Sequence, residues 1–311
     1  MRAAFVGLVS VAALAAGPGL AQERWYPSRF GPQDTLGAVN NLSPEGVRRA
    51  AGLVKLGKVY SLAVPTGPDS PAYGERSYKV EITPAPGEEP PSTGPDEPTG
   101  YDEVVTTSMG IGTQMDGLGH VGVNHRAYNG RTAAEVNTPG GFKQDLSSIP
   151  PIVTRGVLID MARHFGMAQL PAGRVFNRPE IEAAMRAQGV TIRRGDVVLF
   201  HTGWQRMATQ DKAKFLAGEP GIGEGGAAWL ADQGVVAIGS DTWALEALPA
   251  PDPTKPFRVH ALLLAKKGVH ILENVDTAEL AKDRATEFLF VLGQPKFVGT
   301  VQLVVHPVAI R

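Results

Sequence analysis

The sequence contains no cysteine among its 311 residues. A cysteine nucleophile, cysteine-ligated zinc and thiolate iron–sulfur chemistry are therefore excluded. Any metal ion would have to bind to histidine, carboxylate and amide side chains, which favours zinc, manganese or a similar divalent ion. Disulfides are excluded as well, but a chain of this length can bury enough apolar surface to fold without them.

The chain also lacks an excess of charge of either sign. Its 30 Lys and Arg residues balance 31 Asp and Glu residues, which gives a formal net charge of −1. We therefore expect no nucleic-acid partner. The frequent glycine and proline, 37 and 25 residues, indicate a loop-rich α/β protein rather than a helix bundle.

Long apolar stretches are missing except at the N-terminus. Residues 3–16 are apolar and follow Arg2, and a Gly-Pro-Gly break and Ala21 come after them. This layout is typical of a secretory signal peptide, and the apolar run is too short to span a bilayer. We expect a periplasmic or secreted protein with no membrane anchor. Its predicted parts are a signal peptide over 1–21 and one domain over 22–311.

Reactive side chains concentrate between residues 112 and 120, in the stretch Gly-Thr-Gln-Met-Asp-Gly-Leu-Gly-His. Gln114 and Asp116 are two residues apart, so they point to the same side of an extended segment. Their oxygens are suitable ligands for a divalent ion, and the imidazole of His120 can bind a metal or transfer protons. The alternative interpretation is a glycine-rich turn with a capping Asp and a hydrogen-bonded His.

The remaining pattern alternates between strands and helices, which predicts one α/β domain with a sheet core and interleaved helices. A segment rich in proline and acid, 84–100, cannot join the interior of a sheet. We interpret it as a solvated excursion rather than a mobile flap over the site. The predicted helices lie near 44–54, 177–189, 227–231 and 260–267, and the predicted strands near 59–64, 104–107, 156–160, 195–201, 235–239, 269–272, 288–292 and 300–305. Ser43 is the expected N-cap of the first helix, whose expected apolar face holds Val47, Ala50, Ala51 and Val54. Asn177 and Gly189 are the expected start and stop of the second helix.

Further polar side chains follow predicted strands or flank a turn. His201 and Asp241 each follow a short apolar strand, and His260 and Glu273 flank a helix–turn–strand unit that could bring them together. Ligand sites often form at strand ends. Taken singly, each residue also has an ordinary explanation as a cap, a turn residue or a hydrogen-bonded core histidine.

Taken together, these motifs resemble the cyclase family of metal-dependent hydrolases, which includes bacterial kynurenine formamidases and isatin hydrolases. That family carries the pattern His-x-Gly-Thr-His-x-Asp-x-Pro-x-His, and this chain matches it at Gly112-Thr113, Asp116 and His120. Further blocks that resemble the family, in the family's order, are 34–42, 195–204, 239–242 and the pair His260 and Glu273-Asn274.

The chain departs from the family pattern at three positions. Gly110 stands where the family has its first His, Gln114 replaces the second, and Leu118 replaces the proline. The Gly-Thr-Gln-x-Asp form is similar to a branch that includes lactone-cleaving relatives such as trans-dienelactone hydrolase. The loss of two nitrogen ligands favours one ion over two.

The resemblance implies a swivelling β/β/α-type fold, a small-molecule substrate and a homodimer or homotetramer. It implies one zinc or manganese ion held by Gln114, Asp116, His260 and Glu273 and used to activate water. His120 would then be the general acid and base, and His201 and Asp241 would orient His120 or the substrate. The expected reaction opens a cyclic amide or lactone or cleaves an aryl formamide. The alternative is an inactive exported protein of the same fold that binds a metal or small molecule.

Overall fold

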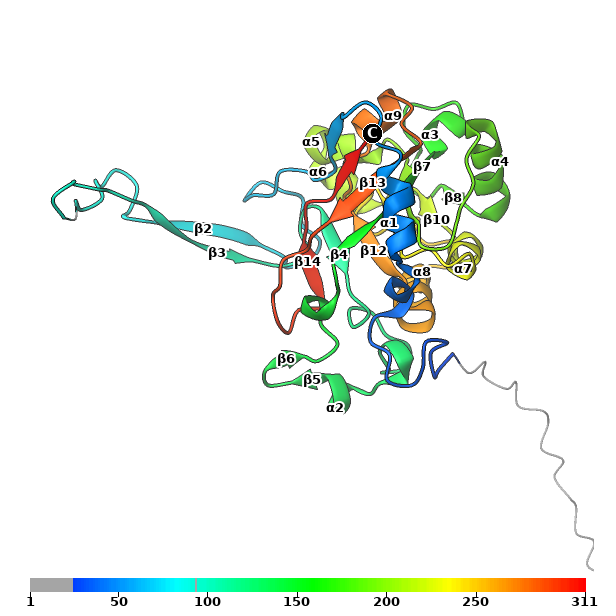
Figure 1. The fold of residues 1–311 in the computed structure, drawn as a ribbon, viewed down its shortest axis with the longest axis horizontal. Helices are drawn as coiled ribbons and strands as arrows, with labels where there is room; N and C mark the ends of the chain where they lie inside the picture. The colour runs from blue at the N-terminus through cyan, green and yellow to red at the C-terminus, as the bar shows by residue number, and fades with distance from the viewer. Residues whose placement is uncertain (1–24, 93) are drawn as a thin grey trace, which may run out of the picture.

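The computed structural model describes residues 25–92 and 94–311, so the signal peptide predicted over 1–21 lies outside the described residues. A nine-stranded sheet forms the centre of the molecule, in the order β1-β15-β13-β7-β9-β11-β12-β4-β14 (Figure 1). Its strands are β1 (Val59–Ser61), β4 (Gln114–Asp116), β7 (Ile152–Asp160), β9 (Val197–His201), β11 (Ala237–Ser240), β12 (His270–Glu273), β13 (Glu287–Leu292), β14 (Gln302–Val304) and β15 (Val308–Ile310).

The sheet is mixed. Neighbours among β7, β9, β11 and β12 run parallel, and the pairings on either side of this block are antiparallel. Three two-stranded pairs lie outside the sheet, formed by β2 (Tyr78–Thr83) with β3 (Asp102–Thr107), β5 (Asn137–Thr138) with β6 (Gly141–Phe142), and β8 (Val175–Phe176) with β10 (Gly221–Ile222). The predicted single α/β domain with a mixed sheet core and flanking helices is confirmed.

Helices and short turns fill the connections between strands. Among the described residues, no helix combines the length and the apolar character needed to cross a membrane. The α-helices are α1 (Pro44–Ala51), α2 (Ala133–Val136), α3 (Met161–His164), α4 (Arg178–Gln188), α5 (Met207–Gln210), α6 (Lys212–Ala217), α7 (Glu224–Asp232), α8 (Arg258–His260) and α9 (Ala278–Lys282). The 3₁₀ turns are η1 (Gly37–Asn41), η2 (Tyr128–Gly130), η3 (Leu146–Ser148) and η4 (Trp204–Arg206), and η5 (Ala261–Lys267) is a π-helix.

Alternating side chains of the central strands enter two cores. On one face, Val157 and Ile159 pack in a cluster with Leu230 of α7 and Leu263 of η5. On the other face, residues such as Leu158 join a second cluster that reaches α9. Strands that are buried on both faces read as nearly continuous apolar runs, which is why the sequence showed them so clearly.

Capping explains where α4 begins and ends. Asn177 and Glu180 form a capping box at its start, and Gly189 ends it in the left-handed region at φ 70°. At α1, Ser43 caps the helix as predicted, since its hydroxyl accepts a hydrogen bond from the Gly46 N–H. The apolar face predicted for that helix is wrong in part, because Val47 and Val54 are exposed.

A long hairpin of β2 and β3 extends away from the body of the molecule (Figure 1). The described residues of the excursion predicted over 84–100 lie at its tip and are mostly exposed, as expected. The sequence indicated the β-prone segment 104–107, but its partner strand over 78–83 was not predicted. A hairpin that carries exposed residues on both strands has no strong apolar alternation to mark it.

Two antiparallel pairings of β4 place the side chains of the candidate site. Gln114 lies opposite Glu273 of β12, and Asp116 lies opposite Gln302 of β14. Residues that face each other across an antiparallel pair point to the same side of the sheet. The predicted same-side arrangement of Gln114 and Asp116 is therefore confirmed, and Glu273 joins them from the neighbouring strand.

A buried ion-pair network gives the first prediction. The guanidinium of Arg155 on β7 donates to Asp196 at 3.1 and 2.7 Å and also contacts Glu287. We expect Asp196→Ala to lower the free energy of unfolding by about 3–5 kcal/mol, because it leaves a buried charge without its bidentate partner. Urea unfolding followed by circular dichroism measures this loss.

The matched control is Glu182→Ala, which removes an exposed ion pair with Arg178 on α4. This control should change the free energy of unfolding by less than about 1 kcal/mol. Equal losses in the two variants would show that the Arg155 network does not stabilise the sheet.

Candidate metal centre

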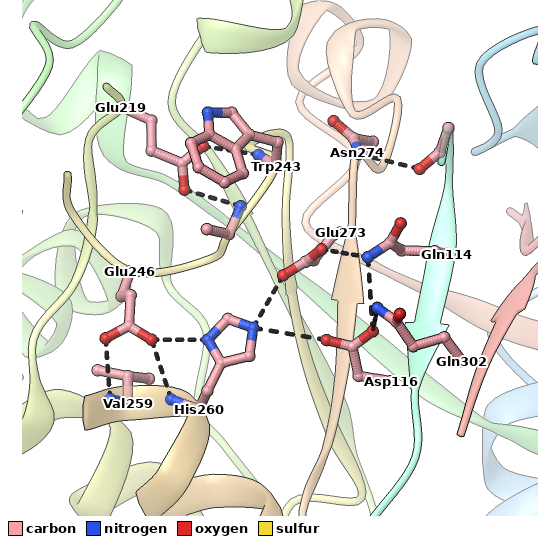
Figure 2. A network of polar contacts seen from close by, with 12 residues as sticks. Gln114, Asp116, Glu219, Trp243, Glu246, Val259, His260, Glu273, Asn274 and Gln302 are labelled. Carbon is pink, nitrogen blue, oxygen red and sulfur yellow. Dashed lines mark hydrogen bonds and ion pairs between the residues drawn. The ribbon is translucent and has the colours of Figure 1, made fainter. Parts of the chain in front are cut away.

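Asp116, His260 and Glu273 form a buried triad whose potential ligand atoms all lie within 4.8 Å of one another. They come from β4, α8 and β12, and their side chains converge on one point (Figure 2). His260 Nε2 lies 3.0 Å from a Glu273 oxygen and 3.5 Å from Asp116 Oδ2. The structure thus brings together three of the four predicted metal ligands in ligand-like positions.

Glu246 sets the orientation of the His260 ring. One Glu246 oxygen lies 2.6 Å from His260 Nδ1, and the carboxylate also accepts hydrogen bonds from the backbone N–H groups of Val259 and His260. The second ring nitrogen, Nε2, is therefore directed at Asp116 and Glu273. A carboxylate that fixes the outer nitrogen of a histidine is a recurring feature of protein metal sites.

A second buried acid supports the loop that carries Glu246. The carboxylate of Glu219 accepts hydrogen bonds from the backbone N–H groups of Trp243 at 2.7 Å and Ala244 at 2.9 Å (Figure 2). Burial raises the pKa of Glu219 well above its usual value, and these hydrogen bonds oppose the shift. The loop before Glu246 is thereby held against the protein interior.

The triad concentrates negative charge among buried side chains. Burial and the nearby Asp116 carboxylate raise the pKa of Glu273 to about 7. Burial alone would lower the pKa of His260, but its contacts with Asp116, Glu246 and Glu273 raise it well above the usual value. Such a cluster strongly favours a positive charge at its centre, either a proton on His260 or a bound cation.

The residues of the triad fit a divalent ion. Asp116 Oδ2 is buried without a hydrogen-bond partner in the described part of the chain. Buried polar atoms in native proteins nearly always have a partner, so such an atom next to His260 and Glu273 indicates a missing one. One imidazole and two carboxylates are a donor set that zinc and manganese accept.

Gln114 lies beside the triad, but its amide nitrogen faces it. Nε2 donates to Glu273 and lies 3.5 Å from Asp116 Oδ1, while Oε1 is turned away (Figure 2). In this orientation Gln114 positions the two carboxylates instead of ligating the ion. Its predicted role as a ligand would require the amide to be turned over and stays a prediction.

Two residues of the site were missed in the sequence. Glu246 orients His260, and Gln302 donates from Nε2 to Asp116 Oδ1 at 2.9 Å. Gln302 reaches the site because β14 pairs with β4, a contact between segments far apart in the sequence. Nothing in the local sequence pattern marks either residue.

His120 lies at the edge of the triad, on the turn that follows β4. Its ring centroid is 6.3 Å from that of His260, and its side chain is partly exposed. Burial lowers the pKa of His120, with the positive charges of His260 and Arg76 adding to the shift and Asp116 opposing it. A histidine that stays neutral at pH 7 can accept a proton, as the predicted general base must.

His201 and Asp241 lie in a separate place, at the carboxyl ends of β9 and β11. His201 Nδ1 is 2.8 Å from Thr277 Oγ1, and Asp241 accepts hydrogen bonds from the backbone N–H groups of Thr202 and Gly203. Both line a cavity of about 550 Å³ whose walls include none of the four predicted metal ligands. No hydrogen bond joins either residue to His120 in the described structure, so their predicted orienting role stays a prediction.

The curled mixed sheet with its buried His–carboxylate triad defines an α/β protein with a candidate site for one divalent metal ion. The sequence profile of the Cyclase family matches residues 60–247, which is more than half of the chain. The chain therefore belongs to this family, as the motifs predicted.

Solved structures share the fold. A crystal structure of a novel cyclase is 28% identical with a TM-score of 0.80, over 91% of this chain and 98% of that one. An isatin hydrolase bound to the product analogue thioisatinate is 18% identical with a TM-score of 0.61, over 86% and 98%. A predicted metal-dependent hydrolase from Bacillus stearothermophilus is 16% identical with a TM-score of 0.53, over 81% and 97%. The comparison with curated proteins finds no match.

The contact between Glu246 and His260 generates the second prediction. We expect Glu246→Gln to weaken zinc binding about 10- to 100-fold, because the neutral amide no longer holds the imidazole as a carboxylate does. Competition with a fluorescent zinc chelator measures the affinity. Glu279→Gln on α9, where the acid pairs with Lys282 at the surface, is the matched control and should bind zinc like the original protein. Unchanged zinc binding by Glu246→Gln would remove Glu246 from the centre.

Proposed function

We propose that this protein is a metal-dependent hydrolase that opens a cyclic amide or lactone or cleaves an aryl formamide. The observation that carries the proposal is the buried triad of Asp116, His260 and Glu273 beside His120, whose lowered pKa keeps the imidazole neutral. Membership in the Cyclase family supports a hydrolytic reaction, and the fold is shared with an isatin hydrolase.

The ligands and their supports have distinct roles in this proposal. Asp116, His260 and Glu273 would hold one zinc or manganese ion, while Glu246 and Gln302 fix the directions of His260 and Asp116. When bound, such an ion lowers the pKa of water and polarises a carbonyl group. The predicted ligand Gln114 would steady both carboxylates from β4.

His120 would carry out the proton transfers. As a neutral imidazole it takes the proton of the attacking water, which becomes the hydroxyl added to the carbonyl carbon. It then returns that proton to the leaving nitrogen or oxygen as the C–N or C–O bond breaks. One histidine thus serves both steps, and the balance of protons is restored at the end of the cycle.

The third prediction is that substitution of a ligand removes the metal, whereas substitution of His120 removes only the turnover. We expect His260→Ala and Glu273→Ala to lose bound zinc, because each removes a ligand from a buried site. His120→Ala should keep the metal and lose about 10²–10⁴-fold in turnover. Metal analysis and a screen of lactones, isatin and N-formylkynurenine measure the two properties.

The surface variant His306→Ala is the control and should keep both metal and turnover, because this side chain is exposed. Retention of zinc by both ligand variants would contradict the metal centre. A metal-bearing protein that hydrolyses none of these compounds would favour an inactive binding protein of the same fold.

The fourth prediction concerns pH. Because burial lowers the pKa of His120, its basic form persists below the usual titration range of histidine, and a bound cation would shift the pKa in the same direction. The midpoint of the acidic limb of kcat/KM should therefore lie below about pH 6.5, the ordinary pKa of histidine. Rates measured from about pH 5 to 8, with metal content checked at each pH, test this. A midpoint above that value would exclude His120 as the base.

A further inference from the structure

Gly110 leaves space that another side chain fills. The residue is buried, and its backbone has none of the positive φ that would by itself require glycine. A Cβ atom placed on Gly110 would lie 2.7 Å from Cζ of Arg76 and 2.8 Å from Oε1 of Gln302. These distances are shorter than non-bonded contacts allow, so a side chain at position 110 would push the ends of the Arg76 and Gln302 side chains out of their present places.

Arg76 thus reaches the candidate metal centre from outside the motif. It lies just before β2, at the base of the long hairpin, and its side chain is only partly exposed. Its neighbour across Gly110 is Gln302, which holds Asp116. The charge of Arg76 also lowers the pKa of both His120 and Glu273, which places it close to the proposed base and to a proposed ligand.

The charge of Arg76 has no counterpart in the described structure. Among residues 25–92 and 94–311, Arg76 forms no ion pair with a carboxylate. A divalent ion would be neutralised by Asp116 and Glu273, and the Glu246 carboxylate is occupied by His260 and two backbone N–H groups. One positive charge therefore remains beside the site and can accept an anion.

We propose that Arg76 binds a carboxylate group carried by the substrate, so that the enzyme acts on cyclic esters or amides that bear a carboxylate. A guanidinium matches a carboxylate with two parallel hydrogen bonds, which fixes the orientation of the bound molecule as well as its position. Gly110 provides the room for this contact. The proposal rests on the proposed hydrolase function for the reaction, while the anion site itself does not require turnover.

A binding experiment tests the anion site without any reaction. Benzoate and its neutral analogue benzamide are titrated by calorimetry into the metal-free and zinc-loaded protein. We expect Arg76→Ala to weaken benzoate binding about 10- to 100-fold, the range of a charge-assisted pair, and to leave benzamide binding unchanged. Arg76→Lys should restore part of the benzoate affinity, because it returns the charge without the bidentate geometry.

Two further variants separate this role from a structural one. Gly110→Ala should weaken benzoate binding with zinc content unchanged, because the added methyl group displaces the guanidinium. Arg186→Ala removes an exposed arginine on α4 and should leave both probes unaffected. If Arg76→Ala lowers the affinity for both probes equally, loses zinc, or leaves benzoate binding unchanged, the proposal is overturned.

Kinetics extend the test to the substrate. For a lactone that carries a carboxylate and for its methyl ester, Arg76→Ala should raise KM about 10- to 100-fold for the acid only. Equal effects on acid and ester would overturn the assignment of substrate class. A protein that hydrolyses neither compound but loses benzoate binding in Arg76→Ala would contradict the hydrolase function and leave the anion site supported.

Discussion

The antiparallel pairing of β4 with its two neighbours is the constraint on which the candidate centre depends. This register sets Gln114 opposite Glu273 and Asp116 opposite Gln302, so four polar side chains meet on one side of the sheet. The intervening Met115 enters the apolar core on the other side. A shift of one residue in the register of β4 would turn the polar side chains into that core. The packing of Met115 on one face of the sheet therefore fixes the positions of the polar side chains on the other face.

The charges of the side chains that this register brings together favour the binding of a cation. Three acids surround His260, and the cost of burying them is offset only when a positive charge lies at the centre. Occupancy of the site and stability of the fold are coupled for this reason, since an ion that binds only the folded chain also stabilises it. The hydrogen bonds from Gln114 and Gln302 reduce the freedom of the carboxylates, so the donor set is already arranged before an ion arrives.

Local signals in the sequence were enough for much of the fold. The capping residues of α4, Asn177 and Gly189, marked its ends, and the apolar run before His201 marked a buried strand. The spacing of Gln114 and Asp116 predicted their common side because alternation in a strand is a local property. The prediction that Val47 lies on a buried helix face is wrong, because Val47 is exposed. Periodicity in the sequence does not reveal whether another element packs against a helix face.

Contacts set by strand order could not be read in the same way. Glu246, Gln302 and Arg76 reach the centre from segments that carry no motif, and only the topology brings them there. The same topology places His201 and Asp241 at the ends of β9 and β11, where they line another cavity. Motifs along the chain therefore predicted the candidate ligands Asp116, His260 and Glu273, but they did not predict the residues around them.

The close approach at Gly110 has an evolutionary consequence. With this backbone, a side chain at position 110 would take the volume that the end of the Arg76 side chain occupies. A histidine there would turn the guanidinium away from its present place beside the candidate centre. The two positions are therefore coupled, because the effect of a substitution at position 110 depends on whether position 76 is an arginine.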